Sequence, residues 1–484
     1  MQKHRKISSA LDSGSSSLHD RRLYLTCPIL LKLSIVYLPM KRFFIESLGC
    51  AKNQVDSETI ITLLSNAGFK YTAEATEAEL ILVNTCGFIQ PAKEESISTV
   101  MDFRSRFPDK KIIMTGCLSQ RYMSELEKEM TEIDGIWGTE YSDSFINYVA
   151  EKTGNSGASR TKSPRNHAPR LTFPGSAYVK IAEGCVNKCS FCAIPIIRGD
   201  LASRPSKEIV DEVKDLLEIG IHEINLVAQD SASYGMDSAA QQNIVSLVRS
   251  ILEIKKDFWL RVLYLHPDKF PFALLDIALA DSRFLPYFDI PFQHASTKIL
   301  RAMGRKGDSS TYANLASRIR DTLPDATLRT TFLVGFPGET DEDFTTLTDF
   351  QKAIKPDWAG VFTYSREEDT PAFNMKNQVT KKTANDRKQK LEEAQTVITS
   401  AWLAAKLANA TKTAAPMQVL VEERVEGSDL FLCRSRFQAP EVDGLTVVEV
   451  PAGADKAKTA PGERINVCIT GVRGVDLTAV YSHE

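Results

Sequence analysis

The amino-terminal part of this chain repeats one arrangement three times: a short apolar run, a cysteine, and a helix-like segment. Cys50, Cys86 and Cys117 follow the three runs at the same position of the repeat. A strand-loop-helix unit repeated in this way is typical of a doubly wound parallel sheet. The sequence therefore predicts an α/β domain over residues 41–150. The three apolar runs are Phe43–Leu48, Leu80–Thr85 and Lys111–Thr115.

The position of these cysteines also predicts that they meet. Loops at the carboxyl ends of parallel strands gather in one crevice, so Cys50, Cys86 and Cys117 are expected to lie together. Free cysteine is often simply buried, and three structural cysteines are one interpretation. Because all three occupy the same place in the repeat, we favour a second interpretation, in which they are the three protein ligands of an iron–sulfur cluster.

A second set of cysteines has the spacing C-x3-C-x2-C, in the segment Gly184-Cys-Val-Asn-Lys-Cys-Ser-Phe-Cys192. Three thiolates leave one iron of a four-iron cluster without a protein ligand, and such an iron can bind a substrate. A zinc site completed by distant residues is the alternative. Zinc ligands usually come in C-x2-C or H-x3-H pairs, and no partner pair lies nearby. The spacing favours a cluster held by Cys185, Cys189 and Cys192.

Six strand-like runs alternate with helical patterns between residues 175 and 405, which predicts an open, partial (β/α)6 barrel. Functional residues are then expected where strands end. Gln229 ends the second run, beside the cysteine loop, and Gly335 and Gly338 would let a ligand approach the backbone closely. Each also has an ordinary interpretation as a turn or core residue. The runs are Tyr178–Ala182, Glu223–Val227, Trp259–Tyr264, Phe288–Pro291, Leu328–Val334 and Gly360–Tyr364.

The remaining segments complete the expected organisation. Residues 1–40 are basic and then apolar, interrupted by Pro28 and Lys32; a signal peptide or anchor is possible from this pattern, but a disordered extension or a mis-assigned start before Met40 is favoured. Residues 151–174 have a linker composition. Residues 411–480 are rich in valine and turn glycines, which predicts a small antiparallel β-barrel.

Composition limits the class of protein. A chain of 484 residues is too long for one core, and a net charge of −3 gives no general attraction to nucleic acid or to anionic membranes. Nine cysteines are too few for a disulfide scaffold over this length. Ligand cysteines must be reduced, so we expect a cytoplasmic protein without membrane attachment.

Several ordered motifs resemble those of the methylthiotransferases of the radical S-adenosylmethionine (SAM) superfamily. They are Ser47-Leu-Gly-Cys-Ala-Lys-Asn-Gln-Val-Asp-Ser57, Asn84-Thr-Cys-Gly-Phe-Ile-Gln90, Leu226-Val-Ala-Gln-Asp230 and the C-x3-C-x2-C loop. The resemblance covers Lys41 to about Asp476. It implies two 4Fe-4S clusters and SAM as cofactors. It further implies that Phe191 packs against the adenine. Gln229, Gly335 and Gly338, which lie at strand ends, are expected to be the other cofactor contacts.

Two branches of that family differ in substrate. The tRNA branch carries Gly-Cys-Gln-Met-Asn at the first cysteine, whereas this chain has Gly-Cys-Ala-Lys-Asn there and Gly-Phe-Ile after Cys86. It resembles the RimO branch, which modifies an aspartate of the small-subunit ribosomal protein S-twelve, although that branch usually has Pro in place of Ala51 and Asp in place of Gln90. The resemblance implies a radical that removes a hydrogen from the aspartate β-carbon, sulfur delivered at the Cys50, Cys86 and Cys117 cluster, and a methyl group from a second SAM. External electron and sulfur donors are expected.

The carboxyl-terminal segment also bears on whether the substrate is a tRNA or a ribosomal protein. It resembles a TRAM domain, usually an RNA-binding module, yet Thr411–Glu484 holds 8 Lys and Arg against 11 Asp and Glu. A domain that grips phosphates is expected to be basic, and an acidic one suits a basic protein partner. We therefore expect a ribosomal protein as substrate, with nucleic acid contacted only through the ribosome. The alternatives are a tRNA adenosine methylthiotransferase and a non-catalytic iron–sulfur electron carrier, which would need closed four-cysteine ligation.

Overall fold

The computed structural model describes residues 41–155, 169–238, 242–413, 416–451, 453–454 and 458–482. The expected extension over residues 1–40 and most of the expected linker lie outside the described residues. Residues 40–484 form one compact unit, and everything below concerns this unit.

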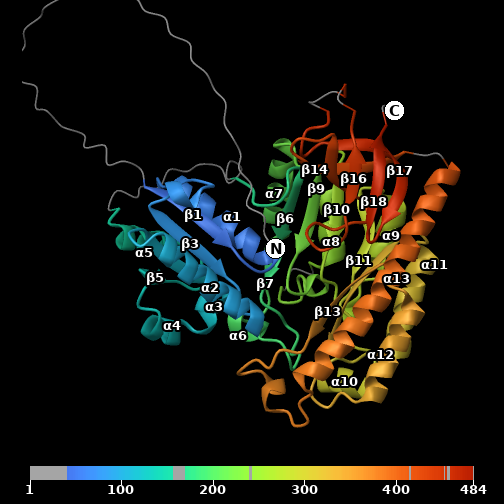
Figure 1. Ribbon diagram of the computed structural model, residues 1–484, viewed down its shortest axis with the longest axis horizontal. Helices are drawn as coiled ribbons and strands as arrows, with labels where there is room; N and C mark the ends of the chain where they lie inside the picture. Colours follow the sequence, from blue (N-terminus) through green and yellow to red (C-terminus); the bar gives the residue numbers. More distant parts are fainter. Residues whose placement is uncertain are drawn as a thin grey trace, which may run out of the picture. The chain divides into compact units, whose positions relative to one another are not determined.

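The amino-terminal sheet has five strands in the order β2-β1-β3-β4-β5, and all its pairings are parallel. Its two faces carry separate apolar cores. Helices α1 and α5 pack on one face and α2 and α4 on the other, which confirms the doubly wound arrangement (Figure 1). The elements are β1 (Arg42–Ser47), α1 (Ala51–Asn66), β2 (Lys70–Tyr71), η1 (Ala75–Glu77), β3 (Leu80–Thr85), α2 (Gln90–Arg106), β4 (Lys111–Gly116), α3 (Cys117–Arg121), α4 (Met123–Glu129), β5 (Gly135–Ile136) and α5 (Asp143–Thr153).

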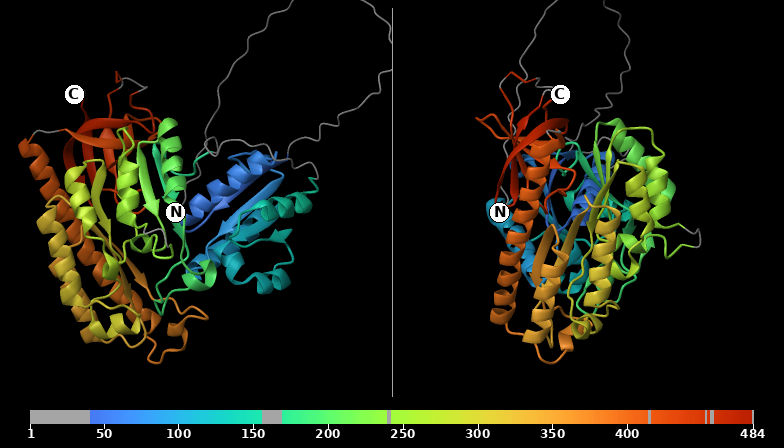
Figure 2. Two further views of the ribbon diagram at one scale, coloured as in Figure 1. Left: turned by 180° about the vertical axis from the view of Figure 1, so that it is seen from behind. Right: turned by 90° about the vertical axis from the view of Figure 1, so that its right-hand side faces the viewer.

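The central sheet has six parallel strands in the order β13-β12-β11-β10-β9-β6, which confirms the open, partial barrel (Figure 2). Helices α7 to α12 alternate with its strands. The elements are β6 (Ser176–Lys180), β7 (Ala182–Glu183), α6 (Ile194–Arg198), β8 (Ala202–Ser203), α7 (Ser206–Glu218), β9 (Glu223–Val227), η3 (Ser231–Ser233), α8 (Ile244–Leu252), β10 (Trp259–Val262), η4 (Pro267–Lys269), α9 (Ala273–Ala280), β11 (Phe284–Asp289), α10 (Thr297–Ala302), α11 (Ser309–Thr322), β12 (Thr327–Val334), α12 (Asp341–Ile354), β13 (Trp358–Thr363) and η5 (Pro371–Asn374).

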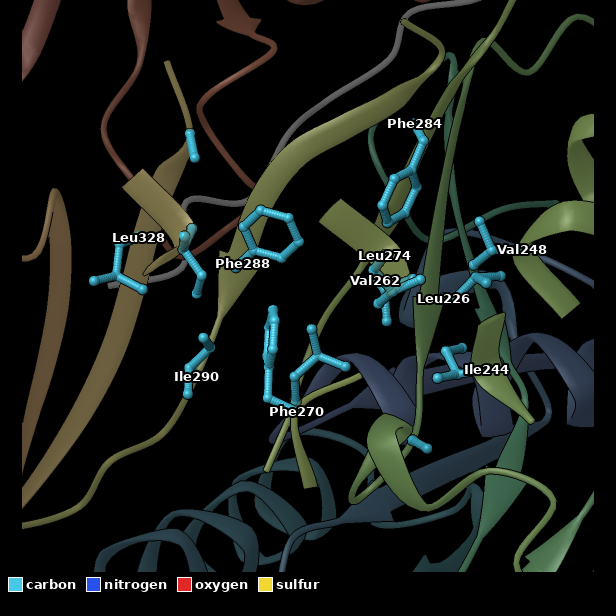
Figure 3. Close-up of a cluster of buried hydrophobic side chains, with 14 of the residues drawn as sticks. Leu226, Ile244, Val248, Val262, Phe270, Leu274, Phe284, Phe288, Ile290 and Leu328 are labelled. Carbon is cyan, nitrogen blue, oxygen red and sulfur yellow. The ribbon is translucent and has the colours of Figure 1, made fainter. Parts of the chain in front are cut away.

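The largest apolar core lies between these strands and their helices. Figure 3 shows part of it, with Leu226, Val262 and Phe288 from three neighbouring strands. The fourth strand, β11, begins at Phe284, whereas the sequence predicted a start at Phe288. The prediction missed the start of the strand because Pro286 cannot donate a ladder hydrogen bond and so argues against a strand. The strand tolerates it because the register with β10 shifts between Leu260 and Val262.

A 33-residue helix, α13 (Lys381–Thr413), leads to a closed five-stranded barrel in the order β14-β15-β16-β18-β17. Four of its five junctions are antiparallel, as expected for this segment. The fifth, between β16 and β18, is parallel. The predicted small barrel is thus confirmed, with one parallel junction that the sequence did not indicate. The strands are β14 (Met417–Arg424), β15 (Leu430–Ser435), β16 (Thr446–Glu449), β17 (Arg464–Arg473) and β18 (Asp476–Tyr481).

A buried group of charges joins this barrel to the central sheet. The Arg434 guanidinium on β15 donates to the Glu223 carboxylate on β9 at 2.6 Å, and Arg261 on β10 donates to the same carboxylate at 3.0 Å. Arg434 also pairs with Glu422 on β14. At the edge of the same contact, a side chain added at Gly175 would lie 2.3 Å from the Gly462 carbonyl oxygen. The two backbones therefore touch with no space between them.

No helix in the described part of the chain is long and apolar enough to cross a membrane.

Candidate functional site

The structure brings together the three loops that carry Cys50, Cys86 and Cys117. Cys50 is the N-cap residue of α1, Cys86 directly follows β3, and Cys117 is the first residue of α3. Gly49 has a φ of +92°, and a Cβ there would lie 3.0 Å from the Cys86 sulfur. Only glycine fits this left-handed, closely packed position. The loops thus meet at the carboxyl edge of the sheet, where a crevice is expected.

Asn53 ties these loops to one another. It is buried in the first turn of α1, where its Nδ2 donates to the carbonyls of Leu48 at 3.0 Å and Thr85 at 2.9 Å. Its Oδ1 accepts the Cys117 thiol at 3.3 Å. One amide therefore fixes the loops after β1, β3 and β4 in register.

A buried arginine from the other cysteine segment reaches Cys117. Arg198, the last residue of α6, donates to the Cys117 sulfur from Nη2 at 3.0 Å and from Nε at 3.3 Å. Its Nη1 donates to Asp56 at 2.7 Å. Burial raises the pKa of Cys117 to about 11, and the Arg198 charge opposes that rise. A cationic donor aimed at a buried sulfur suits the thiolate, which is the form that ligates metals.

The second set of cysteines lies in a tight loop after β7. The backbone N–H and the Nδ2 of Asn187 both donate to the Cys185 sulfur at 3.4 Å, and the Cys192 N–H donates to the Cys189 carbonyl at 3.1 Å. Burial raises the pKa of Cys192 to about 12, with the neighbouring cysteines adding to the rise. The effect of Cys185 and Cys189 on the pKa of Cys192 shows that the three thiols lie near one another.

Neither set has the geometry of a single-ion site. Within the described residues, no three His, Cys, Asp or Glu side chains come close enough to hold one metal ion. Zinc holds each thiolate at about 2.3 Å, so zinc-bound sulfurs lie within about 4 Å of one another. A four-iron cluster is wider and requires its thiolates further apart. Arg198 and Asn187 donate to sulfur atoms of the two sets, which suits the thiolate form that ligates metals.

The four residues expected to contact SAM fall in two places. Phe191 packs against an apolar group that contains Phe336, next to Gly335. Gly335 and Gly338 have φ angles of +75° and +83°; a Cβ at Gly335 would lie 2.5 Å from the Ala384 Cβ, whereas the space at Gly338 is open.

The turn that contains Gly335 and Gly338 is held together by a side chain of its own. Glu339 accepts the N–H groups of Gly335 and Phe336, which gives the glycines a structural role as well.

Gln229 lies apart from that turn. Its Nε2 donates to Glu183 at 2.8 Å, and its Oε1 is buried without a hydrogen-bond partner among the described residues. A buried acceptor without a donor is costly unless a ligand supplies one. Gln229 therefore keeps a free acceptor beside the cysteine loop.

Sequence reasoning missed the charged residues between the two cysteine sets. Asp56 accepts from Arg198, and Lys180 pairs with both Asp56 and Glu183. Asn53 and Asp56 both lie in the motif after Cys50, where their spacing of three places them on one face of a helix. No local pattern marks Lys180 or Arg198, because the partner that they share, Asp56, lies on α1 and is distant in sequence.

Comparisons with known proteins agree with this geometry. Residues 42–138 match the model of Uncharacterized protein family UPF0004, residues 179–350 that of the Radical SAM superfamily, and residues 415–481 that of the TRAM domain. Among solved structures, the radical S-adenosylmethionine methyltransferase TsrM from Kitasatospora setae, with cobalamin and a 4Fe-4S cluster bound, has a TM-score of 0.50 at 16% identity. The match covers 69% of this chain and 77% of that chain. It supports the fold alone.

Curated relatives are much more similar. A protein of Treponema denticola named ribosomal protein uS12 methylthiotransferase RimO is 43% identical over 89% of this chain and 99% of its own length. Proteins of the same name from Carboxydothermus hydrogenoformans and Aquifex aeolicus are 38% and 39% identical, over 92% and 90% of this chain and 100% and 95% of their own lengths.

The parallel barrel and its cysteine loop define the chain as a radical SAM enzyme, and this superfamily implies a 4Fe-4S cluster and SAM. The chain belongs to the RimO family of methylthiotransferases within that superfamily. The resemblance seen in the sequence motifs is thereby confirmed.

Proposed function

We propose that this protein adds a methylthio group to the β-carbon of an aspartate in the small-subunit ribosomal protein uS12. Its relatives carry the name of that activity. The observation that carries the proposal is the contact between Arg198 and Cys117, which links the two cysteine sets. A reaction that makes a radical at one set and consumes sulfur at the other needs the two side by side.

The six cysteines are the proposed ligands. Cys185, Cys189 and Cys192 would hold the cluster that binds SAM, and Cys50, Cys86 and Cys117 would hold a second 4Fe-4S cluster. When bound, these groups supply reductive cleavage of SAM and a sulfur atom for transfer. With three protein ligands each, both sets leave an iron free for an exchangeable partner.

The chain's own side chains prepare this site. Arg198 holds positive charge at the Cys117 sulfur, and its own charge is balanced by Asp56. Phe191 offers an apolar surface for an adenine, and the open backbone at Gly338 leaves room for a ligand. The unpaired Oε1 of Gln229 is an acceptor for the ammonium group of SAM.

The domain assignment follows from these roles. Residues 41–150 form the sulfur-delivering domain, residues 175–405 the radical SAM domain and residues 411–480 a TRAM-like domain, with residues 151–174 as a linker. The acidic carboxyl-terminal segment favours a basic protein over a nucleic acid as partner. Reduced ligand thiols favour the cytoplasm, where external electron and sulfur donors act.

Iron counting tests the ligand assignment. Anaerobic reconstitution should give about eight irons per chain for two four-iron clusters, and about four for Cys117→Ser. Cys185→Ala should abolish cleavage of SAM to 5′-deoxyadenosine. The matched control is Cys468→Ser, an exposed cysteine of the barrel, which should keep the full iron content. Four irons in the unaltered protein would refute the second cluster.

Mass spectrometry tests the substrate. The reconstituted protein, given SAM, a reductant and sulfide, should add one methylthio group to one aspartate of uS12. Transcribed tRNA, offered in parallel, should remain unchanged. Modification of a tRNA adenosine with uS12 left intact would overturn the proposal.

A further inference from the structure

One positive charge beside the first cysteine set, that of Lys52, has no direct ion pair in the described part of the chain, and the Asp289 and Glu183 carboxylates act on it only at longer range. Lys52 follows Cys50 by two residues, and its Nζ lies 3.7 Å from the centre of the Tyr264 ring. Within the described part of the chain, its ammonium group makes no hydrogen bond and no ion pair with a carboxylate. A cation over an aromatic face is stabilised without being neutralised.

Three other cations of this region, Arg329, Lys180 and Arg198, are already paired with carboxylates. Arg329, inside the central sheet, contacts Asp289 at 3.2 Å and Asp443 at 3.4 Å. Lys180 contacts Glu183 at 2.6 Å, and Arg198 contacts Asp56 at 2.7 Å. Unlike these three cations, Lys52 forms no close pair with a carboxylate in the described part of the chain, so its charge is open to an incoming anion.

The platform beneath Lys52 is held in an unfavourable backbone conformation. Tyr264, just past the end of β10, has a φ of +63°, and Gln293, beyond the end of β11, has a φ of +68°. Non-glycine residues in this region are strained, and such strain clusters at ligand sites. The Asp289 carboxylate accepts the Tyr264 backbone N–H at 3.2 Å, which helps to hold the backbone in this conformation. The ends of two neighbouring strands, β10 and β11, are therefore each followed by a non-glycine residue with a positive φ.

We propose that Lys52 binds the carboxylate of the substrate aspartate; this rests on the proposed function. The carboxylate carbon is bonded to the β-carbon that receives the sulfur. An ammonium group two residues from Cys50 would therefore hold that β-carbon between the two cysteine sets. In a partly buried site the attraction between the two charges is stronger than in water. Lys52 would then be a specificity-determining residue that accepts aspartate and disfavours its neutral amide.

The test compares two forms of uS12, one with the target aspartate and one in which it is replaced by asparagine. Binding of each to reconstituted protein is measured anaerobically by fluorescence anisotropy. Lys52→Met should weaken binding of the aspartate form about tenfold, the scale of one charge-assisted contact, and leave the asparagine form unchanged. Lys52→Arg should restore most of the difference. Lys382→Met removes an equal charge from a side chain that is 87% exposed and should have no effect.

The readout is the ratio of the two dissociation constants. A partly lost cluster would weaken both forms alike and leave the ratio intact, so misassembly of the variant does not imitate the expected result. Equal ratios in the unaltered protein and in Lys52→Met would overturn the role of Lys52. Failure of the unaltered protein to bind either form of uS12 would instead count against the proposed function.

Discussion

Arg198 belongs to the segment that carries one cysteine set and contacts a cysteine of the other set. It ends the short helix after Cys192, and it lies buried between Asp56 and the Cys117 sulfur. A buried charge costs several kcal/mol unless it is paired. Arg198 is paired on both sides only when the domains that carry Cys117 and Cys192 are in contact. Its charge therefore stabilises the arrangement in which α6, the helix after Cys192, packs against Cys117.

A buried histidine makes a prediction about acid stability. His294 is fully buried after β11, where burial, helped by Arg387 and Lys298, lowers its pKa to about 3 from an ordinary value of 6.5. Between these values the unfolded chain binds a proton that the folded protein refuses, so the free energy of unfolding falls as the pH falls. At pH 5.5 this cost is about 1.4 kcal/mol.

The measurement is urea denaturation at pH 7.5 and 5.5. His294→Gln, whose Oε1 can accept the Ser296 N–H that now donates to the ring, should lose about 1.4 kcal/mol less than the unaltered protein between the two pH values. Equal losses would show that His294 is not held neutral.

At the scale of elements, four buried charges join β9 and β10 to β14 and β15. Their side chains are at most 2% exposed. Burial alone would raise the pKa of Glu223, but Arg434 and Arg261 hold it at about 2. Removing one partner of a buried pair leaves an uncompensated charge, which is far more costly than a lost surface contact.

Glu223→Gln should therefore reduce the free energy of unfolding by about 3–5 kcal/mol. Guanidinium denaturation followed by circular dichroism gives this value. The matched control is Asp386→Asn, which breaks an exposed pair with Lys382 and should cost under about 0.5 kcal/mol. Similar stabilities for the two variants would mean that the buried group adds nothing to the junction.

Local patterns predicted most elements but not this junction. Apolar runs marked the strands, and the cysteines after them marked the loops that meet. Pro286 concealed the start of β11, because proline normally argues against a strand. Arg261 and Arg434 could not be predicted as buried, since arginine is mostly exposed unless paired and their shared partner, Glu223, is distant in sequence. Arg198 could not be predicted as buried for the same reason, since its partner Asp56 is also distant in sequence.

At the scale of the whole molecule, charge is unevenly distributed along the sequence. The net charge is only −3, yet the segment from Thr411 onward alone carries that excess. Glu426 and Asp429 are exposed in the loop between β14 and β15. Exposed acidic side chains on the barrel should attract a basic protein partner, and added salt should weaken this attraction.

The double variant Glu426→Lys and Asp429→Lys should weaken binding of uS12 by about fivefold or more at low salt, since each exposed charge contributes up to about 1 kcal/mol. The difference should shrink at high ionic strength. Asp349→Lys with Asp386→Lys, on α12 and α13, reverses two exposed charges elsewhere and is the control. Tighter binding of tRNA by the first variant, with no change for uS12, would contradict this role of the barrel.

The close contact of Gly175 with Gly462 and the charges at Glu223 have a consequence for how such proteins can diverge. A carboxyl-terminal barrel taken from an unrelated chain would place another residue at Gly462, where φ is +100° and a Cβ would lie 3.2 Å from the Gly175 nitrogen, and would leave Glu223 and Arg261 without Arg434. Recombination between genes therefore cannot exchange this module freely. The two sides of the junction must be inherited together, so new substrates are reached more easily by changes in surface loops than by domain shuffling.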